Sequence, residues 1–394
     1  MEDALTAKNI PKVFVYGFFL NFLVMIPILV PYWQGLGLTL KEIFGLQGVF
    51  GASLILCDAP SGYVADLLGR KKVLLVGTII SALSYQWFLF AHTFFEFAVM
   101  ECLLGLGLSL QAGCDVAILY NSLEKTNYTG SKAKVLGKRM MSVTAGEGVA
   151  SVLCGALATV SIKLPIYVNA VTCWIPVIIA LTFYDNGKTL SRNSHLQNFK
   201  MIGKALFGHS RLLTMVIFSF VFYSFATYCA VWSVQPYWES RGIGYSMFGY
   251  LWAINSFAIA LVSRYAHAIE RKIGSTASIV ILGLAPIVGY LGMGVTPGLF
   301  GLLFILAFPI CRGLSQVLFQ DAINTRVPAE IRSTSNSIGP LGMRMLFLIF
   351  GPLLGAILDK RGPDQAMIGM GIVYVVVFLV IALPLLGQRR HFAN

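Results

Sequence analysis

Twelve apolar segments, each close to the length of a membrane-spanning helix, occupy almost the whole chain. A helix needs about 20 residues to cross the roughly 30 Å of hydrocarbon in a bilayer. The segments cover residues 13–33, 43–65, 73–92, 94–121, 138–161, 164–184, 212–238, 246–270, 275–294, 297–321, 334–358 and 365–386. This pattern predicts an all-α membrane protein with twelve transmembrane helices. The first segment lacks a small-residue cleavage site, so we expect a retained helix and not a signal peptide.

The composition supports the same class of protein. Of the 394 residues 57% are hydrophobic and only 12% are charged, about half the charge of a soluble domain. The formal net charge of +12 raises the question of nucleic-acid binding. However, the basic residues sit in short loops, without the basic patch or basic amphipathic helix that such binding requires. We therefore expect a lipid bilayer as the partner and no nucleic acid.

Basic residues are distributed unevenly over the loops. With the N-terminus placed inside, 22 of the 29 Lys and Arg residues fall in cytoplasmic segments. The outer loops hold five, namely Lys41, Lys163, Arg241, Lys360 and Arg361. By the positive-inside rule, this bias predicts that both termini are cytoplasmic. The short loops favour a bacterial inner (plasma) membrane as the location.

The longest polar stretch, residues 185–211, separates two sets of six segments. We expect an N-terminal six-helix bundle over 1–184, a cytoplasmic linker over 185–211 and a pseudo-symmetric C-terminal six-helix bundle over 212–394. A short internal sequence repeat supports the division into two related halves. Residues 65–71, which begin Ala-Asp and end Arg-Lys, are matched by residues 266–272, which begin Ala-His and end Arg-Lys.

The loop between the second and third segments carries the pattern Gly62-x-x-x-Asp66-x-x-Gly69-Arg70-Lys71. Gly62 permits close helix packing and Gly69 permits a tight turn. Asp66 can accept hydrogen bonds from a helix N-terminus, and Arg70 can form a bidentate pair with a carboxylate. With twelve segments and a central loop around it, this pattern resembles motif A of the major facilitator superfamily. Residues 326–334 are similar to the loop of that family between helices ten and eleven.

The resemblance implies a secondary transporter that works by alternating access. It also implies a cytoplasmic latch, in which Asp66 faces the start of helix eleven near Ser333–Ser335. Arg70 would pair with an acid at the inner end of helix four. Asn121 stands where related sequences often carry Asp, so Glu124 is the alternative partner.

The resemblance does not extend to the motifs of the drug–proton antiporters. Those proteins usually have an Arg in helix four and a Gly-Pro pair in helix five. Here the first position reads Glu101-x-x-x-Gly105, and the stretch 146–155 contains no Pro. We expect transport of a small organic solute, coupled to H⁺, with efflux as the first direction. Import of a nutrient or a siderophore-like metal chelate, and facilitative uniport, remain alternatives.

Away from the ends of the predicted spans lie six ionisable residues, which we take as charges inside the bilayer, where each costs a few kcal/mol and is a functional candidate by default. The acids are Asp58, Glu101, Asp115 and Glu147, and we assign them as candidates for ion or proton coupling. The arginines Arg312 and Arg344 are candidates for substrate binding, because a guanidinium can hold an anionic group. Buried salt bridges are the alternative role for all six. Polar residues complete the set of substrate candidates: Asn21, Tyr228, Gln235 and Gln316.

Helix four shows a regular spacing. At 100° per residue, Glu101, Gly105, Leu108, Ala112 and Asp115 share one face of a continuous helix. In the superfamily, helices one, four, seven and ten line the cavity, so this face is expected to line it. Glu101 would otherwise face the outer vestibule.

Other classes of function lack their signals. A membrane-embedded enzyme would need a nucleophile–base pair or a metal cluster at a membrane face, and the sequence shows neither. A channel would need a ring-lined pore, whereas the charges here are scattered over several helices. The seven cysteines lie in apolar runs without a CxxC pair, which indicates packing roles. We expect no enzyme activity, no cofactor and no metal site, and a monomer as the family default.

Overall fold

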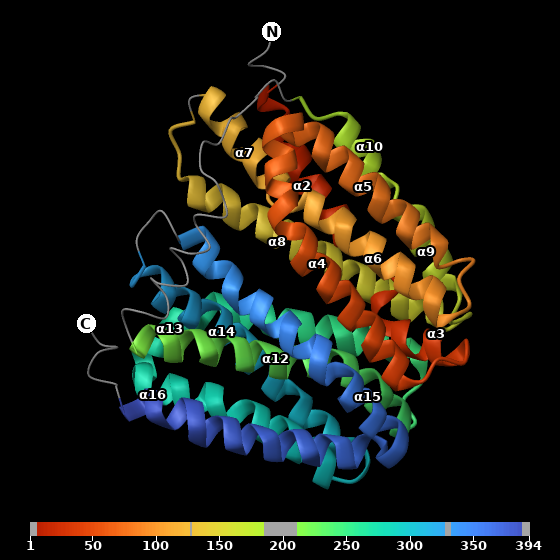
Figure 1. The fold of residues 1–394 in the computed structure, drawn as a ribbon, viewed down its shortest axis with the longest axis vertical. Coiled ribbons are helices and arrows are strands. Elements are labelled where there is room, and N and C mark those ends of the chain that lie inside the picture. The colour runs from red at the N-terminus through yellow and green to blue at the C-terminus, as the bar shows by residue number, and fades with distance from the viewer. Residues whose placement is uncertain (1–5, 127, 185–210, 328–331, 388–394) are drawn as a thin grey trace. The chain divides into compact units, whose positions relative to one another are not determined.

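The structure is a computed structural model that describes residues 6–126, 128–184, 211–327 and 332–387. Throughout these ranges the chain forms helices joined by turns, without a β-strand (Figure 1). This confirms the all-α class. The side chains of Asp66 and of 332–334 fall outside the description.

The helices follow one another along the chain with short connections. In the first half they are α2 (Asn9–Leu20), η1 (Ile26–Ile28), α3 (Leu29–Gly35), α4 (Leu40–Leu68), α5 (Arg70–Trp87), α6 (Phe94–Gln111), α7 (Cys114–Lys125), α8 (Lys132–Ala158), α9 (Leu164–Thr172) and α10 (Ile175–Leu181). In the second half they are α12 (Arg211–Ser240), α13 (Tyr245–Val295), η2 (Gly298–Leu306), α14 (Ala307–Asn324), α15 (Arg332–Val377), η4 (Phe378–Ala382) and α16 (Leu383–Gly387).

Eight helical stretches in the described residues are long and apolar enough to cross a membrane. Two of them, Tyr245–Val295 and Ser335–Gly387, have 51 and 53 residues, well beyond the ~20 that one crossing needs. Each contains a glycine with non-helical backbone angles, Gly274 and Gly362 respectively, where two helices meet. The protein is therefore a multi-pass helical membrane protein, while the count of twelve and the side of the termini stay predictions.

The first predicted helix is not continuous. Hydropathy predicts a single helix over 13–33, but α2 ends at Leu20 and the chain resumes as η1 and α3. Pro27 lies in the first turn of η1. A proline has no N–H and is tolerated in the first turn of a helix, so Pro27 suits the start of η1, while α2 has already ended at Leu20.

The expectation of one regular face along helix four is wrong. Ala112 leaves the helix with ψ of 119° and Gly113 has φ of +76°, so the predicted segment 94–121 divides into α6 and α7. Glycine tolerates a positive φ that other residues rarely adopt. The 100° spacing that related Glu101 to Asp115 therefore does not apply, since the two residues lie on different helices.

The chain forms two compact units. One consists of Met1–Leu38, Leu46–Arg192 and Gly244–Ala253, the other of Thr39–Gly45, Asn193–Ile243 and Ile254–Asn394. The first turns of α4 thus belong to the second unit, and the rest of this helix belongs to the first. Nearly all of the predicted linker 185–211 lies outside the described residues, so the division into 1–184 and 212–394 stays a prediction.

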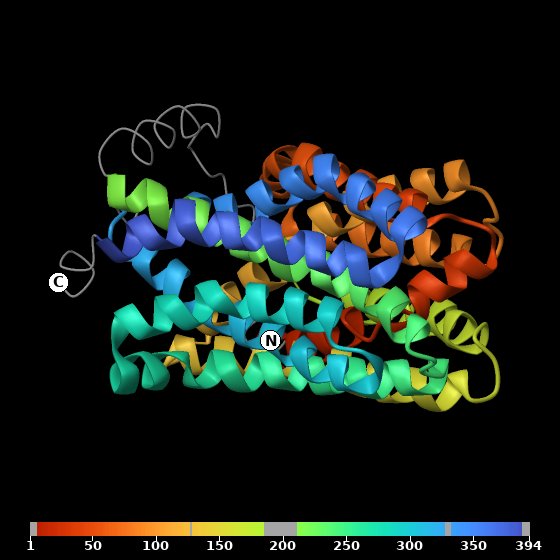
Figure 2. The same cartoon turned by 90° about the horizontal axis from the view of Figure 1, so that it is seen from below.

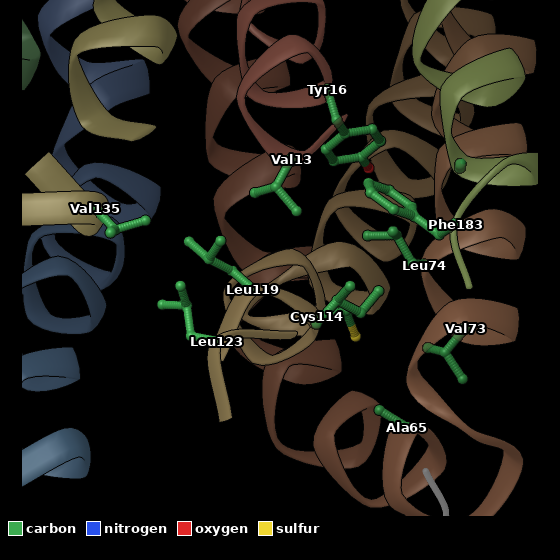
Figure 3. Packing of buried hydrophobic residues seen from close by; sticks show 12 residues of the cluster. Val13, Tyr16, Ala65, Val73, Leu74, Cys114, Leu119, Leu123, Val135 and Phe183 are labelled. Atoms are coloured by element: carbon green, nitrogen blue, oxygen red, sulfur yellow. The ribbon is translucent and has the colours of Figure 1, made fainter. Parts of the chain in front are cut away.

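Each unit has its own apolar core. In the first unit, Val13 and Tyr16 of α2, Leu74 of α5 and Leu119 of α7 are almost fully buried against one another (Figure 3). In the second unit, α12 packs along α15 (Figures 1 and 2). In a bilayer such contacts are stabilised by van der Waals packing between helices, because lipid tails are as apolar as these side chains. It holds the polar groups described next in fixed positions.

Candidate functional site

An ion pair joins α7 to α8 inside the first unit. Arg139 donates to Oδ2 of Asp115 from Nη2 at 2.5 Å and from Nε at 2.8 Å. The two side chains are 16% and 5% exposed. Asp115 is one of the candidates for ion coupling, and the structure places it opposite this cation. In the sequence Arg139 counts among the cytoplasmic basic residues, so it is not identified as a partner of Asp115. In the structure it lies in α8.

A chain of neutral hydrogen bonds lies beside the end of α6. The hydroxyl of Tyr16 donates to Oε1 of Gln111 at 2.9 Å and lies 2.8 Å from Oγ1 of Thr78. The amide of Gln111 donates to Oγ of Ser81 at 2.8 Å. Since these buried groups satisfy one another, we interpret the network as structural.

Glu101 is buried within the first unit. Its side chain in α6 is 3% exposed, so it does not face an open vestibule. Its one hydrogen bond among the described residues comes from Nε2 of Gln47 in α4, at 3.2 Å. Gln47 is 54 positions away in sequence, and no local pattern marked it. A carboxyl group with a single neutral partner is chemically suited to bind and release a proton.

The other two acids have different surroundings. Glu147 in α8 is half-buried and its Oε1 accepts a hydrogen bond from the indole Nε1 of Trp252 in α13, at 3.3 Å. Asp58 in α4 is exposed and accepts a hydrogen bond from Oγ of Ser109 at 2.8 Å. The four predicted acids therefore do not converge on one cluster.

In the second unit, α14 carries three polar side chains four residues apart. These are Arg312, Gln316 and Gln320, all of intermediate exposure. Residues at this spacing lie on one side of a helix. Within the described part of the chain, none of the three side chains forms a hydrogen bond or an ion pair. Gln320 was not among the substrate candidates predicted from the sequence, although its i, i+4 spacing from Gln316 could have indicated it.

Each of the remaining substrate candidates has interactions with neighbouring groups. The ring of Tyr228 packs edge-on against Phe347, with centroids 4.7 Å apart. Gln235 is fully buried, and Arg344 has interaction partners of its own. Asn21 donates from Nδ2 to the carbonyl of Gly17 at 3.1 Å and ends α2.

The motif A loop forms the expected tight turn. Gly69 separates α4 from α5 with φ of +91°. The guanidinium of Arg70 has no ion pair with a described residue, and Glu124 pairs with Lys132 at 3.2 Å. The latch assigned to Gly62, Asp66, Gly69, Arg70 and Lys71 stays a prediction, because the side chain of Asp66 lies outside the described residues.

Metal-ligating side chains are scattered. In the described ranges, no group of three or more His, Cys, Asp or Glu side chains could hold an ion. No cysteine in these ranges forms a disulfide.

Comparisons with solved structures identify the fold. The nucleoside transporter NupG superposes with a TM-score of 0.72 over 100% of both chains, at 16% identity. A bacterial homologue of the human lysosomal transporter Spinster, in its inward-facing and unoccupied conformation, gives 0.74 over 99% of this chain and 98% of that one, at 15% identity. At such identities the likeness concerns the fold alone.

Sequence comparisons give the family. The quinolone resistance protein NorA of Staphylococcus aureus is 26% identical over 153 residues, which is 39% of this chain and 38% of that protein. An uncharacterized MFS-type transporter of Methanocaldococcus jannaschii is 23% identical over 272 residues, or 66% of each chain. The model of the Major Facilitator Superfamily matches residues 13–343. The chain therefore belongs to the Major Facilitator Superfamily, a family of membrane transporters.

Proposed function

We propose that this transporter moves a small organic anion, that Arg312 binds its anionic group, and that export coupled to H⁺ is the first direction to test. The observation that carries the proposal is the surroundings of Arg312. Its guanidinium lies near the middle of the apolar stretch Gly298–Asn324 without a bonded partner among the described residues.

The cost of such a charge argues for a polar environment around it. An arginine at the centre of a bilayer costs about 2.5–3.5 kcal/mol even on insertion scales. The side chain of Arg312 is partly exposed. A partly exposed, unpaired guanidinium at this depth is tolerable where it meets water or a ligand, and not where it meets lipid. Its planar fork matches the geometry of a carboxylate or a phosphate.

The two glutamines extend this surface along α14. Gln316 and Gln320 each offer an amide donor and an amide acceptor on the same side of the helix as Arg312. Together the three side chains would suit a solute with one anionic group and further polar groups. Tyr228, Gln235, Arg344 and Asn21 remain substrate candidates of second rank.

Proton coupling is assigned to a carboxyl group that is free to change its charge. Asp115 is held opposite Arg139, so its charge serves the ion pair. Glu101, with its one neutral donor, is the first choice, and Glu147 beside Trp252 is the second.

Export as the direction of transport is proposed from the name of one relative. The NorA protein is named for quinolone resistance, which suggests export, but the match covers 38% of its length. Import of a nutrient or metal chelate, and uniport, are the competing proposals. We further propose a monomer in the cell inner membrane with both termini in the cytoplasm, following the distribution of basic residues.

A substrate panel in proteoliposomes tests the proposal. Anionic, neutral and cationic solutes of similar size are offered under counterflow, with and without an imposed pH gradient. We expect selective exchange of anions, and accumulation against a gradient only when a pH difference is present. Equal transport of cations would contradict the role of Arg312, and transport indifferent to the pH gradient would contradict proton coupling.

A further inference from the structure

The spacing of Gly62, Asp66 and Gly69 recurs near the end of the chain. Residues 355–362 read Gly-Ala-Ile-Leu-Asp-Lys-Arg-Gly, with the same Gly-x-x-x-Asp-x-x-Gly pattern. The backbone repeats as well. Gly69 has φ of +91° and ψ of 138°, and Gly362 has φ of +78° and ψ of 171°. The second copy therefore shares both the sequence pattern and the turn of the first.

The aspartate of this second copy caps the N-terminus of α4. Oδ1 of Asp359 accepts a hydrogen bond from the backbone N–H of Leu40 at 2.9 Å, and Oδ2 accepts one from Lys41 at 2.9 Å. These N–H groups have no partner within their own helix. A carboxylate at a helix N-terminus also interacts favourably with the helix dipole.

The first glycine of the copy allows the close approach. A Cβ atom at Gly355 would lie 2.5 Å from the carbonyl oxygen of Leu40 and 2.8 Å from Cα of Lys41. Further along the same two helices, the rings of Phe44 and Phe347 stack with centroids 5.8 Å apart. The start of α4 thus rests on one side of α15 through a stack, a backbone contact and two charge-assisted hydrogen bonds.

This contact lies at the opposite end of α4 from the motif A loop. α4 has 29 residues, which is enough to cross the bilayer. Its first residues, Thr39–Gly45, belong to the same compact unit as Asp359, and the helix from Leu46 onward belongs to the other unit. The contact between Asp359 and the start of α4 therefore involves a helix whose residues belong to both units.

We propose that residues 355–362 form a second conformational latch, at the membrane face opposite motif A, in which Asp359 holds the N-terminus of α4 in one state of the transport cycle and releases it in the other. This proposal does not depend on the identity or charge of the substrate.

A reversible cross-link tests whether the contact must open. Lys41→Cys and Lys360→Cys are introduced together, with Cys57 and Cys102, the two cysteines that are not buried, replaced by Ser. A short bifunctional thiol reagent should reduce counterflow by at least about tenfold, and reduction should restore it when a cleavable reagent is used. Unchanged counterflow in the cross-linked protein would overturn the proposal, since the contact would then be static.

A second measurement needs no substrate and separates this proposal from that of the anion site. The rate of maleimide labelling is measured at Leu68→Cys, an exposed position at the far end of α4. Asp359→Asn and Gly355→Ala should each change this rate by about threefold to tenfold, because both shift the balance of states. Gly355→Ala serves where Asp359→Asn does not fold.

Glu42→Gln is the matched control. Glu42 caps the same helix end locally, accepting from the N–H and hydroxyl of Thr39 at 2.8 Å. A mere loss of helix capping would act equally in both variants. We expect Glu42→Gln to leave labelling at Leu68→Cys unchanged. An equal change in Glu42→Gln, or no change in Asp359→Asn and Gly355→Ala, would overturn the latch.

Discussion

Two arginines of this protein lie in membrane-spanning helices, in opposite circumstances. Arg139 of α8 is bonded through two nitrogens to Asp115. Arg312 of α14 has no bonded partner among the described residues. Both are long, permanently charged side chains, so the difference lies in what the neighbouring helices offer them.

The presence or absence of a bonded partner distinguishes an arginine with a structural role from one that is suited to bind a ligand. A buried charge whose partner is removed destabilises a protein strongly, because the remaining charge stays desolvated. An unpaired charge that the fold tolerates must be solvated in another way, by water or by a ligand. Arg139 therefore belongs to the architecture, and Arg312 to the proposed binding site.

The largest expected effect is on the ion pair. Asp115→Asn should lower the free energy of unfolding by about 3–5 kcal/mol, since it leaves Arg139 buried and uncompensated. Unfolding in detergent, followed by denaturant or heat, measures the loss. The double variant Asp115→Asn with Arg139→Gln should recover a large part of it. A loss in the double variant equal to the sum of the two single losses would show that the pair has no coupling.

Arg312 should respond in the opposite way. Arg312→Gln should weaken anion binding by about 100-fold, as expected for the loss of charge-assisted hydrogen bonds worth about 3 kcal/mol. Its thermal stability should stay the same or rise. Binding titration and thermal unfolding check the two parts, with Arg264→Gln, at an exposed position, as the matched control. A loss of stability in Arg312→Gln would place this residue with Arg139 and remove the contrast.

Glu101 provides a smaller and more selective test. Glu101→Gln retains an acceptor for Gln47, so we expect the free energy of unfolding to change by less than about 1 kcal/mol. Accumulation driven by a pH gradient should fall by about tenfold while counterflow persists, because the amide cannot carry a proton. Glu147→Gln, assayed in parallel, distinguishes the two acids. If accumulation survives in Glu101→Gln and is lost in Glu147→Gln, the coupling group is Glu147.

The exposed pair of Lys132 and Glu124 should matter least. Its side chains are 43% and 63% exposed, and such pairs contribute about 0–1 kcal/mol. Lys132→Met should change the free energy of unfolding by less than about 0.5 kcal/mol, measured as for Asp115→Asn. A loss comparable to that of Asp115→Asn would show that burial is not what distinguishes the two pairs.

The helix breaks were not predictable from hydropathy. Leu108 to Asp115 read as part of one apolar segment, because Ala112 and Gly113 are compatible with a helix. Gly113 nevertheless has a positive φ, a conformation that glycine permits but that hydropathy does not indicate. In contrast, the turn at Gly69 was predicted, because charged residues follow it directly and end the apolar segment.

The interaction partners of the charged residues were likewise not predictable from the sequence. The sequence singled out Asp115 and Glu101 as costly charges, but it did not indicate that Arg139 neutralises one and Gln47 contacts the other. Asp359 falls in a predicted outer loop and was not among the candidate residues. Its role as the cap of α4 depends on a contact across 319 positions of sequence.

The sequence by itself determined that this protein is a helical, multi-pass membrane protein of a transporter family. It could do so because hydropathy is a local property and a helix satisfies its backbone hydrogen bonds within one segment. Only the tertiary structure decided which charges are paired, which have no bonded partner among the described residues, and where a helix ends short of its apolar segment. Those outcomes depend on contacts between segments far apart in sequence, which no local pattern records.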